Sequence, residues 1–556
     1  MSTTAVQGVT SSGQPVLILK EGSSQSRGKE AQRNNIQAAK LVAEIVKSSI
    51  GPRGMDKMLV DSLGDVTITN DGATMLKEID VQHPAAKMLV EVSKATDNEV
   101  GDGTTSAVIL AGALLEKAEG LIDKGVHPTI IVEGYNKAAA KAIAVLNDFA
   151  EKVPANSKDW LIKIARTSMQ TKLVSRESQE LAELVVTAVL QVAEKTDTGT
   201  YRVDLDNIKV EKKPGGSLQD TTLISGIVLD KEVVHAGMPK RVEKAKIALV
   251  NAAFEIEKTE FDAKLNISDP SMMKKFLDEE TRMLKDMSDK VVSIGANVLV
   301  CQKGMDDIAQ HYLAKAGILA VRRAKESDMT KLSKATGARI ANNFNDLSSK
   351  DLGSADVVEE RKVEQDKWVF VEGCKNPKAV TLLIRGGTQR IVDEADRSMH
   401  DALMVTKDVV EKPAIVAGGG APEAETAFQI MKWTEKLNGR EQLAAQKFAE
   451  ALETIPICLA TNAGLDPIDT MTEIRAKHAD GNKWFGVEAK DGKVKDMYKE
   501  NVFEPLSVKE QIVKSSTEAA CMILRIDDVI ASGKGKGPSG PPGGAGGMGG
   551  GEGDFD

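Results

Sequence analysis

The spacing of apolar residues predicts long helices in the first 150 residues. Apolar positions recur at alternating intervals of three and four between residues 36 and 50, which is the repeat of one helix face. Gly51-Pro52 ends this pattern, because proline cannot continue a helix. The same repeat begins again after Gly103 and covers residues 108–122. Between these helices, residues 58–69 predict a short hairpin.

The pattern changes near Ser217 to short apolar strands that alternate with helices. Strands are predicted at residues 299–300, 318–321, 368–370 and 380–384, and helices at 306–315, 329–336 and 388–410. This alternation is typical of an α/β domain. After Pro413 the pattern is helical again up to about Ile530. The order helical, mixed, helical is compatible with one helical domain that is interrupted by an inserted α/β domain.

Both ends of the chain lack the apolar positions that a core needs. Residues 1–30 are polar, and residues 532–556 are mostly glycine with some proline, serine and lysine. Segments of this composition bury too little apolar surface to become ordered. We therefore expect residues 532–556 to form a flexible tail and residues 1–30 to be partly mobile.

Composition excludes several classes of protein. Hydrophobic residues make up 41% and charged residues 28% of the 556 residues, which predicts a soluble chain with large cores in about three domains. The net charge of -9 and the lack of a basic stripe argue against nucleic acid as the main partner. The longest apolar run, residues 107–115, is much shorter than the ~20 residues of a membrane span.

The cysteines and the N-terminus indicate a reducing compartment. The four cysteines are scattered and form no C-x-x-C pair, so neither a disulfide framework nor a zinc site is expected; they are Cys301, Cys374, Cys458 and Cys521. The first residues lack the basic-then-apolar order of a signal peptide. We expect a cytoplasmic protein.

One glycine-rich loop has the residues that a phosphate and metal site needs. Gly101-Asp102-Gly103-Thr104-Thr105-Ser106 precedes a helix, whose N-terminal N–H groups favour an anion. Asp102 would repel phosphate unless a cation lay between them, so it is a candidate Mg²⁺ ligand. The loop matches neither the Walker sequence nor the dinucleotide fingerprint. An ordinary helix N-cap is the alternative interpretation.

Three further glycine-bearing loops are weak signals when each is taken alone. The loop G-P-R-G-M-D-K at 51–57 could be a plain helix stop. N-D-G-A-T at 70–74 could be an ordinary turn, and G-G-G-A-P-E at 418–423 could be an ordinary loop. Three more motifs belong to the same set: G-D-G-T-T-S at 101–106, D-R-S-M-H-D-A-L at 396–403 and V-K-D-M at 494–497. The six motifs, in the order in which they occur along the chain, resemble those of the group II chaperonins. That family comprises the archaeal thermosome and the eukaryotic cytosolic chaperonin. The resemblance extends from about Gln14 to Ile530, and the Gly- and Met-rich tail is similar to that of the thermosome.

The resemblance implies a multidomain α and α/β fold. A mainly helical, discontinuous equatorial domain binds ATP, a small discontinuous intermediate domain carries hinges, and an inserted α/β apical domain with a helical protrusion grips substrate. The implied limits are 1–154 and 412–531 for the equatorial domain, 155–223 and 376–411 for the intermediate domain, and 224–375 for the apical domain. Gly215-Gly216 and Gly386-Gly387 are the expected hinges.

The resemblance also assigns residues to the nucleotide. The phosphates are expected at Gly51, Pro52, Gly72, Gly103, Thr104, Thr105 and Ser106. The implied cofactors are ATP and Mg²⁺, with Asp102 as the metal ligand. Gly419 is placed against the nucleoside, Asp496 at the ribose hydroxyls and Glu488 near the base.

Three residues are expected to act in ATP hydrolysis. Asp71 matches an acid near the γ-phosphate, and Lys172 matches a lysine of the intermediate domain that senses it. Asp401 matches the acid that the intermediate domain brings to the nucleotide, where it would orient the attacking water. The alternatives are a solvated surface lysine for Lys172 and a surface pair with Arg397 for Asp401.

A charged, Met-rich helix after Asp269-Pro270 is the expected lid. Its large apolar residues also allow an ordinary packed amphipathic helix; they are Met273, Phe276, Leu277, Met283, Leu284 and Met287. The resemblance implies non-native proteins as substrates, two stacked rings of eight or nine identical or sister subunits, and no separate co-chaperonin. A ring scaffold or holdase with little hydrolysis is the main alternative, and a metabolic kinase or ligase is the second.

Overall fold

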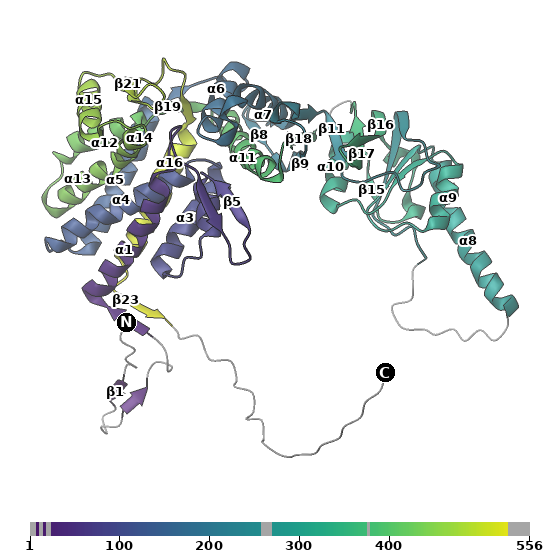
Figure 1. Cartoon of the computed structure of the whole chain (residues 1–556), viewed down its shortest axis with the longest axis horizontal. Helices are drawn as coiled ribbons and strands as arrows, with labels where there is room; N and C mark the ends of the chain where they lie inside the picture. The colour runs from purple at the N-terminus through teal and green to yellow at the C-terminus, as the bar shows by residue number, and fades with distance from the viewer. Residues whose placement is uncertain (1–6, 10–14, 18–23, 257–269, 375–377, 532–556) are drawn as a thin grey trace, which may run out of the picture.

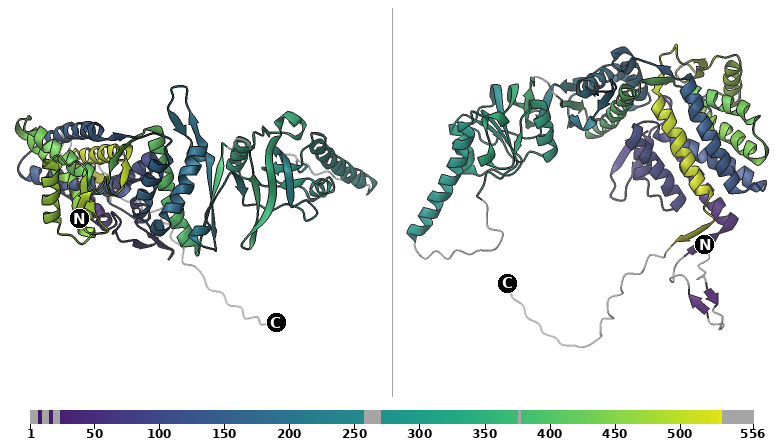
Figure 2. Two further views of the ribbon diagram at one scale, coloured as in Figure 1. Left: turned by 90° about the horizontal axis from the view of Figure 1, so that it is seen from above. Right: turned by 180° about the vertical axis from the view of Figure 1, so that it is seen from behind.

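The chain folds into an elongated arch in which a helical body, a small middle body and an α/β body follow one another (Figure 1). The computed structural model describes residues 7–9, 15–17, 24–256, 270–374 and 378–531. The same succession of bodies is visible from above and from behind (Figure 2). The tail predicted at residues 532–556 lies outside the described residues.

The helical body is built from both ends of the chain. Its helices are α1 (Gly28–Lys47), α2 (Gly72–Glu78), α3 (Pro84–Val100), α4 (Thr104–Asp123), α5 (Pro128–Phe149), α12 (Ala421–Thr434), α13 (Gly439–Leu452), α14 (Thr454–Asn462), α15 (Pro467–Ala479) and α16 (Leu506–Leu524). Helix α4 is buried along most of its length, and α1, α3, α13 and α16 pack around it. Tyr135 of α5 donates a hydrogen bond to the Leu114 carbonyl (2.8 Å) and packs edge-on against Phe448. The two helical parts of the sequence therefore share one core.

Short strands fasten the edges of the helical body. They are β4 (Lys57–Val60), β5 (Val66–Thr69), β6 (Glu151–Lys152), β19 (Ala414–Ala417), β20 (Phe485–Glu488), β21 (Lys493–Asp496) and β22 (Phe503–Pro505). The hairpin predicted within residues 58–69 is β4–β5. Strands β1 (Gln7–Val9) and β2 (Pro15–Leu17) form a separate antiparallel pair.

The chain is ordered earlier than its polar N-terminal composition predicts. Strand β3 (Ser24–Arg27) pairs antiparallel with β23 (Asp528–Ala531), and Gln25 donates hydrogen bonds to the Asp528 carboxylate. Helix α1 then starts at Gly28, before the apolar repeat becomes visible in the sequence. The order comes from main-chain pairing with a distant segment, which needs no apolar pattern.

The middle body has a three-stranded sheet covered by helices. Its elements are α6 (Lys158–Met169), α7 (Ser178–Val192), β7 (Ala193–Lys195), β8 (Tyr201–Val203), β9 (Ile208–Pro214), β10 (Thr222–Ile224), β18 (Val380–Gly386) and α11 (Gln389–Glu411). The strand order is β10-β18-β9, with β18 parallel to β9. Helix α11 lies against this sheet and reaches back to the helical body. The Gly215 N–H donates to the Gly386 carbonyl (2.7 Å), so the two predicted hinges lie side by side.

The α/β body is built on a seven-stranded mixed sheet. Its elements are β11 (Gly226–Leu229), β12 (Arg241–Val250), α8 (Pro270–Ser293), β13 (Val298–Cys301), α9 (Asp307–Lys315), β14 (Leu319–Val321), α10 (Glu326–Thr336), β15 (Ile340–Ala341), β16 (Gly353–Val363) and β17 (Asp366–Glu372). The strand order is β11-β17-β16-β12-β13-β14, with β15 beside β12. Helix α8 projects from this body (Figure 1). The alternation predicted for this region is therefore present.

Candidate functional site

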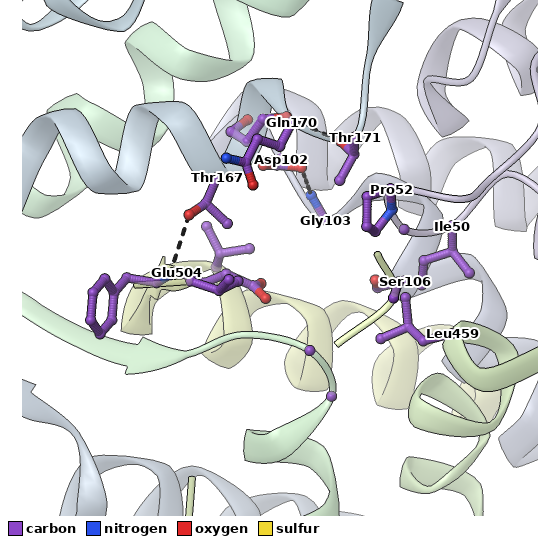
Figure 3. A pocket seen from close by; sticks show the side chains of 18 of the residues that line it. Ile50, Pro52, Asp102, Gly103, Ser106, Thr167, Gln170, Thr171, Leu459 and Glu504 are labelled. Atoms are coloured by element: carbon purple, nitrogen blue, oxygen red, sulfur yellow. Dashed lines mark hydrogen bonds between the residues drawn. The ribbon is translucent and has the colours of Figure 1, made fainter. Parts of the chain in front are cut away.

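A cavity of about 440 Å³ lies where the middle body meets the helical body. Its walls come from the start of α4, the loop after α1, α6, α11, the loop before α12, and the segment from β20 to α16. Most of the site residues expected from the sequence line it, namely Gly51, Pro52, Asp71, Asp102, Gly103, Thr104, Thr105, Ser106, Lys172, Asp401, Gly419 and Glu488. Segments from distant parts of the sequence, such as those of Pro52 and Glu504, are thus brought together (Figure 3).

The N-terminus of α4 forms one wall and has no side-chain cap. Its N-cap residue is Gly103, with φ at +77°, and a Cβ there would lie 2.7 Å from the Cδ1 of Ile512. Only glycine fits this close approach, and the N–H groups of the first turn are left for an anion. Asp102 points its carboxylate back to the Gly103 N–H (2.7 Å), which fixes its side chain beside this helix end.

The loop that carries Asp71 is locked against the start of α4. Asp71 caps α2 by accepting a hydrogen bond from the Thr74 N–H (2.7 Å), and its other oxygen accepts one from the Thr104 hydroxyl (3.1 Å). Gly72 does not line the cavity, but a Cβ there would lie 2.8 Å from the Thr105 nitrogen. Gly72 therefore lets the two loops touch, which holds two carboxylates beside one helix N-terminus.

Gly51 begins the third loop at this end of the cavity. Its φ is +84°, and a Cβ would lie 2.5 Å from the Cδ2 of Leu459 on α14. The loop stays in place because Asn462 donates hydrogen bonds to the carbonyls of Lys47 (3.0 Å) and Ile50 (2.9 Å). The glycine is thus required by both conformation and space.

An ion pair between Lys172 and Asp401 closes the cavity from the middle body. Both side chains are buried, with 7% and 9% of their surface exposed. Burial lowers the pKa of Lys172, but the carboxylates of Asp401, Asp102 and Asp71 outweigh it and raise that pKa, so Lys172 is a cation. Burial also raises the pKa of Asp401 well above its ordinary value, and only Lys172 opposes this change.

Neither surface alternative holds for this pair. Lys172 is buried rather than solvated, and Arg397 donates to Glu394 (2.7 Å) instead of pairing with Asp401. Asp401 is the acid of α11 that faces the cavity, while Lys172 follows α6. Two elements of the middle body therefore supply one charged contact to the site.

The opposite end of the cavity is formed by the loop before α12 and the β20–β21 hairpin. Gly419 has φ at +68°, and a Cβ there would lie 2.9 Å from the Val487 carbonyl oxygen. The Glu488 carboxylate accepts hydrogen bonds from the N–H groups of Lys490 (3.1 Å) and Asp491 (2.6 Å). The carboxylate of Glu488 is therefore already hydrogen-bonded within the β20–β21 turn, although Glu488 lines the cavity.

The prediction for Asp496 is not supported by its position. Asp496 does not line the cavity; it accepts a hydrogen bond from the Tyr498 N–H (3.2 Å) and pairs with Lys499 (3.2 Å). The next residue, Met497, lines the cavity instead. Asp496 is the last residue of β21, and these two local contacts hold its carboxylate.

The comparison with known proteins identifies the family. The TCP-1/cpn60 chaperonin family matches residues 42–534. This chain belongs to that family. It is 57% identical to the thermosome subunit alpha of Archaeoglobus fulgidus over 534 residues, which is 96% of this chain and 98% of that protein. It is also 57% identical to a thermosome subunit of Methanopyrus kandleri over 520 residues, or 94% of this chain and 95% of that one.

A solved structure supports the same assignment for this chaperonin chain. The open-state monomer of a group II chaperonin from Methanococcoides burtonii matches with a TM-score of 0.58 and 45% sequence identity, covering 77% of this chain and 100% of that one. The predicted resemblance to group II chaperonins and the multidomain α and α/β fold class are confirmed. Among the described residues, no helix is both long and apolar enough to cross a membrane.

The chaperonin cavity also contains residues that sequence reasoning missed. Glu504 lines it across from Asp102 and Gly103 (Figure 3). Lys509, at 5% exposure, pairs with Glu504 (2.6 Å) and Glu423 (2.8 Å). The F-E-P-L sequence around Glu504 has no glycine motif to mark it, so only its place beside Pro505 at the start of α16 could have drawn notice.

Two buried polar atoms of the cavity wall have no hydrogen-bond partner. They are Oδ1 of Asn70 and Oγ of Ser168. Such atoms are costly to leave unpaired, which fits a wall that meets a polar ligand. In the described part of the chain no group of three or more His, Cys, Asp and Glu side chains is arranged to hold a metal. Magnesium in phosphate sites needs only one or two carboxylates besides the phosphates, and Asp102 and Asp71 fit that requirement.

Proposed function

We propose that this chaperonin subunit binds ATP with Mg²⁺ in the cavity and hydrolyses it. Hydrolysis would close a built-in lid over a ring chamber in which non-native proteins fold. The observation that carries this proposal is the Lys172–Asp401 pair, which the middle body places opposite an uncapped helix N-terminus and two carboxylates.

The phosphates would lie at the N-terminus of α4. Its free N–H groups and the hydroxyls of Thr105 and Ser106 supply donors without a conformational change, whereas the Thr104 hydroxyl already donates to Asp71. Bound Mg²⁺ would neutralise phosphate charge and polarise the phosphoryl group. Asp102 would hold the metal, and Asp71 would help to orient its shell, because both are fixed by hydrogen bonds to main-chain N–H groups.

Asp401 and Lys172 would act on the terminal phosphate. Lys172 is a cation in this environment and would contact a γ-phosphate oxygen. Asp401 would orient the attacking water and accept its proton late in the reaction; the raised pKa of this buried carboxyl favours that acceptance. Because both belong to the middle body, rotation of that body would make or break the complete site.

The nucleoside would lie against Gly419, beside the Met497 side chain and the Val487 carbonyl, where a Cβ would not fit. Asp496 was expected to accept hydrogen bonds from the ribose, but Glu504 is better placed because its carboxylate is in the cavity wall. We propose Glu504 as the ribose acceptor. Lys509 would orient this carboxylate through their ion pair (2.6 Å) and oppose the rise in its pKa that burial causes.

The domain limits predicted from the resemblance fit this mechanism. Gly215-Gly216 and Gly386-Gly387 would be the hinges, because they meet at the Gly215–Gly386 hydrogen bond at one end of the β9–β18 pair. The α/β body would be the substrate-gripping domain, and α8 would belong to its lid. Non-native proteins suit the exposed side chains of that helix, among them Phe276 and Leu277.

The subunit would act in two stacked rings of eight or nine identical or sister subunits, in the cytoplasm. The β4–β5 hairpin leaves several large apolar residues exposed, namely Met58, Val60, Leu63 and Ile68. Exposed apolar residues gathered on one element suit a subunit contact. Counting subunits in end-on electron micrographs of native particles tests the ring, and a monomer as the sole species with or without ATP would exclude it.

The test of the function itself combines two measurements on the purified assembly. Steady phosphate release without an added acceptor is expected if the subunit is an ATPase. ATP should also make a bound non-native protein resistant to protease. A scaffold or holdase would show neither, and a kinase or ligase would need a small acceptor for turnover.

A further inference from the structure

A buried histidine fastens the segment that forms the nucleoside end of the cavity. His478 lies in the last turn of α15, and its side chain is 0% exposed. Its Nδ1 lies 2.5 Å from the Oε2 of Glu425 on α12. Its Nε2 lies 2.8 Å from the carbonyl oxygen of Phe485, the first residue of β20. One ring thus joins three elements.

Both nitrogens of His478 face acceptors, so each contact must contain a proton. A carbonyl oxygen only accepts, so Nε2 carries a hydrogen. Burial acts to raise the pKa of Glu425, but hydrogen bonds from His478 and Gln429 hold it below its ordinary value. The carboxylate is therefore ionised and accepts from Nδ1. The contact is a charge-assisted hydrogen bond inside the protein, which is stronger than a neutral one.

This contact closes a ring of interactions around Gly419. Glu425 lies in the first half of α12, which begins directly after Gly420. On the other side, Phe485 precedes Gly486, where a Cβ would lie 2.6 Å from the Gly419 carbonyl oxygen. The same Gly419 oxygen accepts a hydrogen bond from the Val487 N–H (2.8 Å). Two contacts therefore fix the distance between the Gly419 loop and β20. One is the Val487–Gly419 hydrogen bond beside the cavity, and the other is the link through His478, which does not line the cavity.

Apolar packing at this end of the cavity is limited, which makes the link more important. The α15 and β20 segment packs on a small cluster separate from the main core, made of Ala424, Ala460, Met471, Ile474 and Val487. Val487 belongs to this cluster and also lines the cavity. A small shift of α15 would therefore move the cavity wall directly.

We propose that His478 and Glu425 are positioning residues that hold the nucleoside-binding wall of the ATP cavity in place. This inference rests on the proposed binding of ATP. Neither side chain lines the cavity, so they act through Phe485, Val487 and Gly419. They are far from Lys172 and Asp401 in the architecture, so they should govern nucleotide affinity and not the chemical step.

The test compares ATP dissociation constants and single-turnover hydrolysis rates at saturating ATP in the assembled protein. His478→Gln and Glu425→Leu each break the charged link. Glu425→Gln should preserve a hydrogen bond, because its amide can donate to Nδ1 while Nε2 still donates to Phe485. Arg475→Met is the matched control: it removes the ion pair (2.7 Å) between Arg475, on the same helix as His478, and Glu453 at the start of α14. Neither residue of that pair lies in β20.

His478→Gln and Glu425→Leu should raise the dissociation constant of ATP about tenfold, the scale of one lost buried hydrogen bond. The saturated single-turnover rate should stay within about threefold of the native rate. Glu425→Gln and Arg475→Met should bind ATP almost normally. If Arg475→Met lost as much affinity for ATP, the loss would come from general destabilisation of α15, and the inference would be overturned. Native affinity in His478→Gln, or a fall in the saturated rate alone, would also overturn it. Failure of the native protein to bind ATP would instead refute the proposed function.

Discussion

Lys172 and Asp401 stand 229 positions apart in the chain and form one buried ion pair at the mouth of the cavity. Lys172 follows α6 and Asp401 lies in α11, so the pair exists only when the two crossings of the middle body are packed together. The carboxylates of Asp71 and Asp102 add negative charge nearby. Together with Asp401 they raise the pKa of Lys172, which is the cation that balances these three acids. The charge balance of the site therefore couples the middle body to the helical body.

Removal of Lys172 alone should destabilise the protein more than removal of the whole pair. Lys172→Met leaves the Asp401 carboxyl buried without a partner, which typically costs about 3–5 kcal/mol. The double variant Lys172→Met/Asp401→Leu removes that unpaired group and should recover most of the loss. Thermal unfolding of the two variants in parallel measures this difference. A double variant as unstable as Lys172→Met would show that the pair is not a closed electrostatic unit.

Asp408 should make stability depend on pH. Burial raises its pKa to about 7, and the Ser507 hydroxyl, which donates to it (2.8 Å), opposes this only in part. The folded state therefore binds the proton more tightly than the unfolded state does. The resulting stability is fully present below about pH 4 and is lost as pH rises through about 7, with an upper limit of about 4 kcal/mol.

Asp408→Asn should remove this dependence. The variant should gain thermal stability over the native protein at pH 8, where the native carboxylate is ionised, and gain little or none at pH 5. Comparison of unfolding midpoints at the two pH values measures the effect. Native and variant curves that stay parallel across this range would place the titration elsewhere.

The ribose acceptor can be identified with two amide substitutions. Glu504→Gln should weaken ATP binding by about tenfold, because a cavity carboxylate is lost. Asp496→Asn should bind ATP normally, since Asp496 does not line the cavity and pairs with Lys499. The reverse ranking of the two dissociation constants would restore the assignment made from the sequence.

The loops at the α4 end of the cavity could be picked out from the sequence because their signals are local. Each loop is a short run of glycine with a neighbouring acid or hydroxyl, and glycine is needed wherever backbone approaches backbone, as at Gly72 and Gly103. The helical repeat likewise predicts α4 and α11 nearly to their ends. These features depend on only a few consecutive residues.

The features of the fold and the site that the sequence did not predict depend on contacts between distant segments. No local pattern shows that Lys172 meets Asp401, or that β3 pairs with β23 across 500 residues. The assignment of the ribose to Asp496 stays a prediction. The cavity wall contains Glu504 and not Asp496, and no local pattern shows which acid of this segment meets the cavity. Composition also gave no sign of strand β3, whose order comes from main-chain hydrogen bonds to β23.

Deletion of the α8 protrusion should separate hydrolysis from enclosure. Phe276, Leu277 and Met283 are exposed on this helix, whereas Leu284 is 1% exposed and belongs to the core of the α/β body. A deletion of residues 261–283 therefore spares that core; residues 261–269 lie outside the described part. ATP hydrolysis should continue, because α8 is remote from the cavity. Protease protection of a trapped substrate on ATP addition should be lost, and its persistence would remove α8 from the lid.

The most direct test of the account is single-turnover ATP hydrolysis measured beside ATP binding in Asp401→Ala, Asp401→Asn and Asp102→Ala. Both Asp401 variants should bind ATP nearly normally, because the loops around Asp102 and Gly103 stay intact. Their hydrolysis should fall by about 10²-fold or more, the scale of a positioned proton acceptor. Asp102→Ala should weaken Mg²⁺-dependent binding itself. Hydrolysis at the native rate in either Asp401 variant would contradict the central claim that the middle body completes the catalytic site.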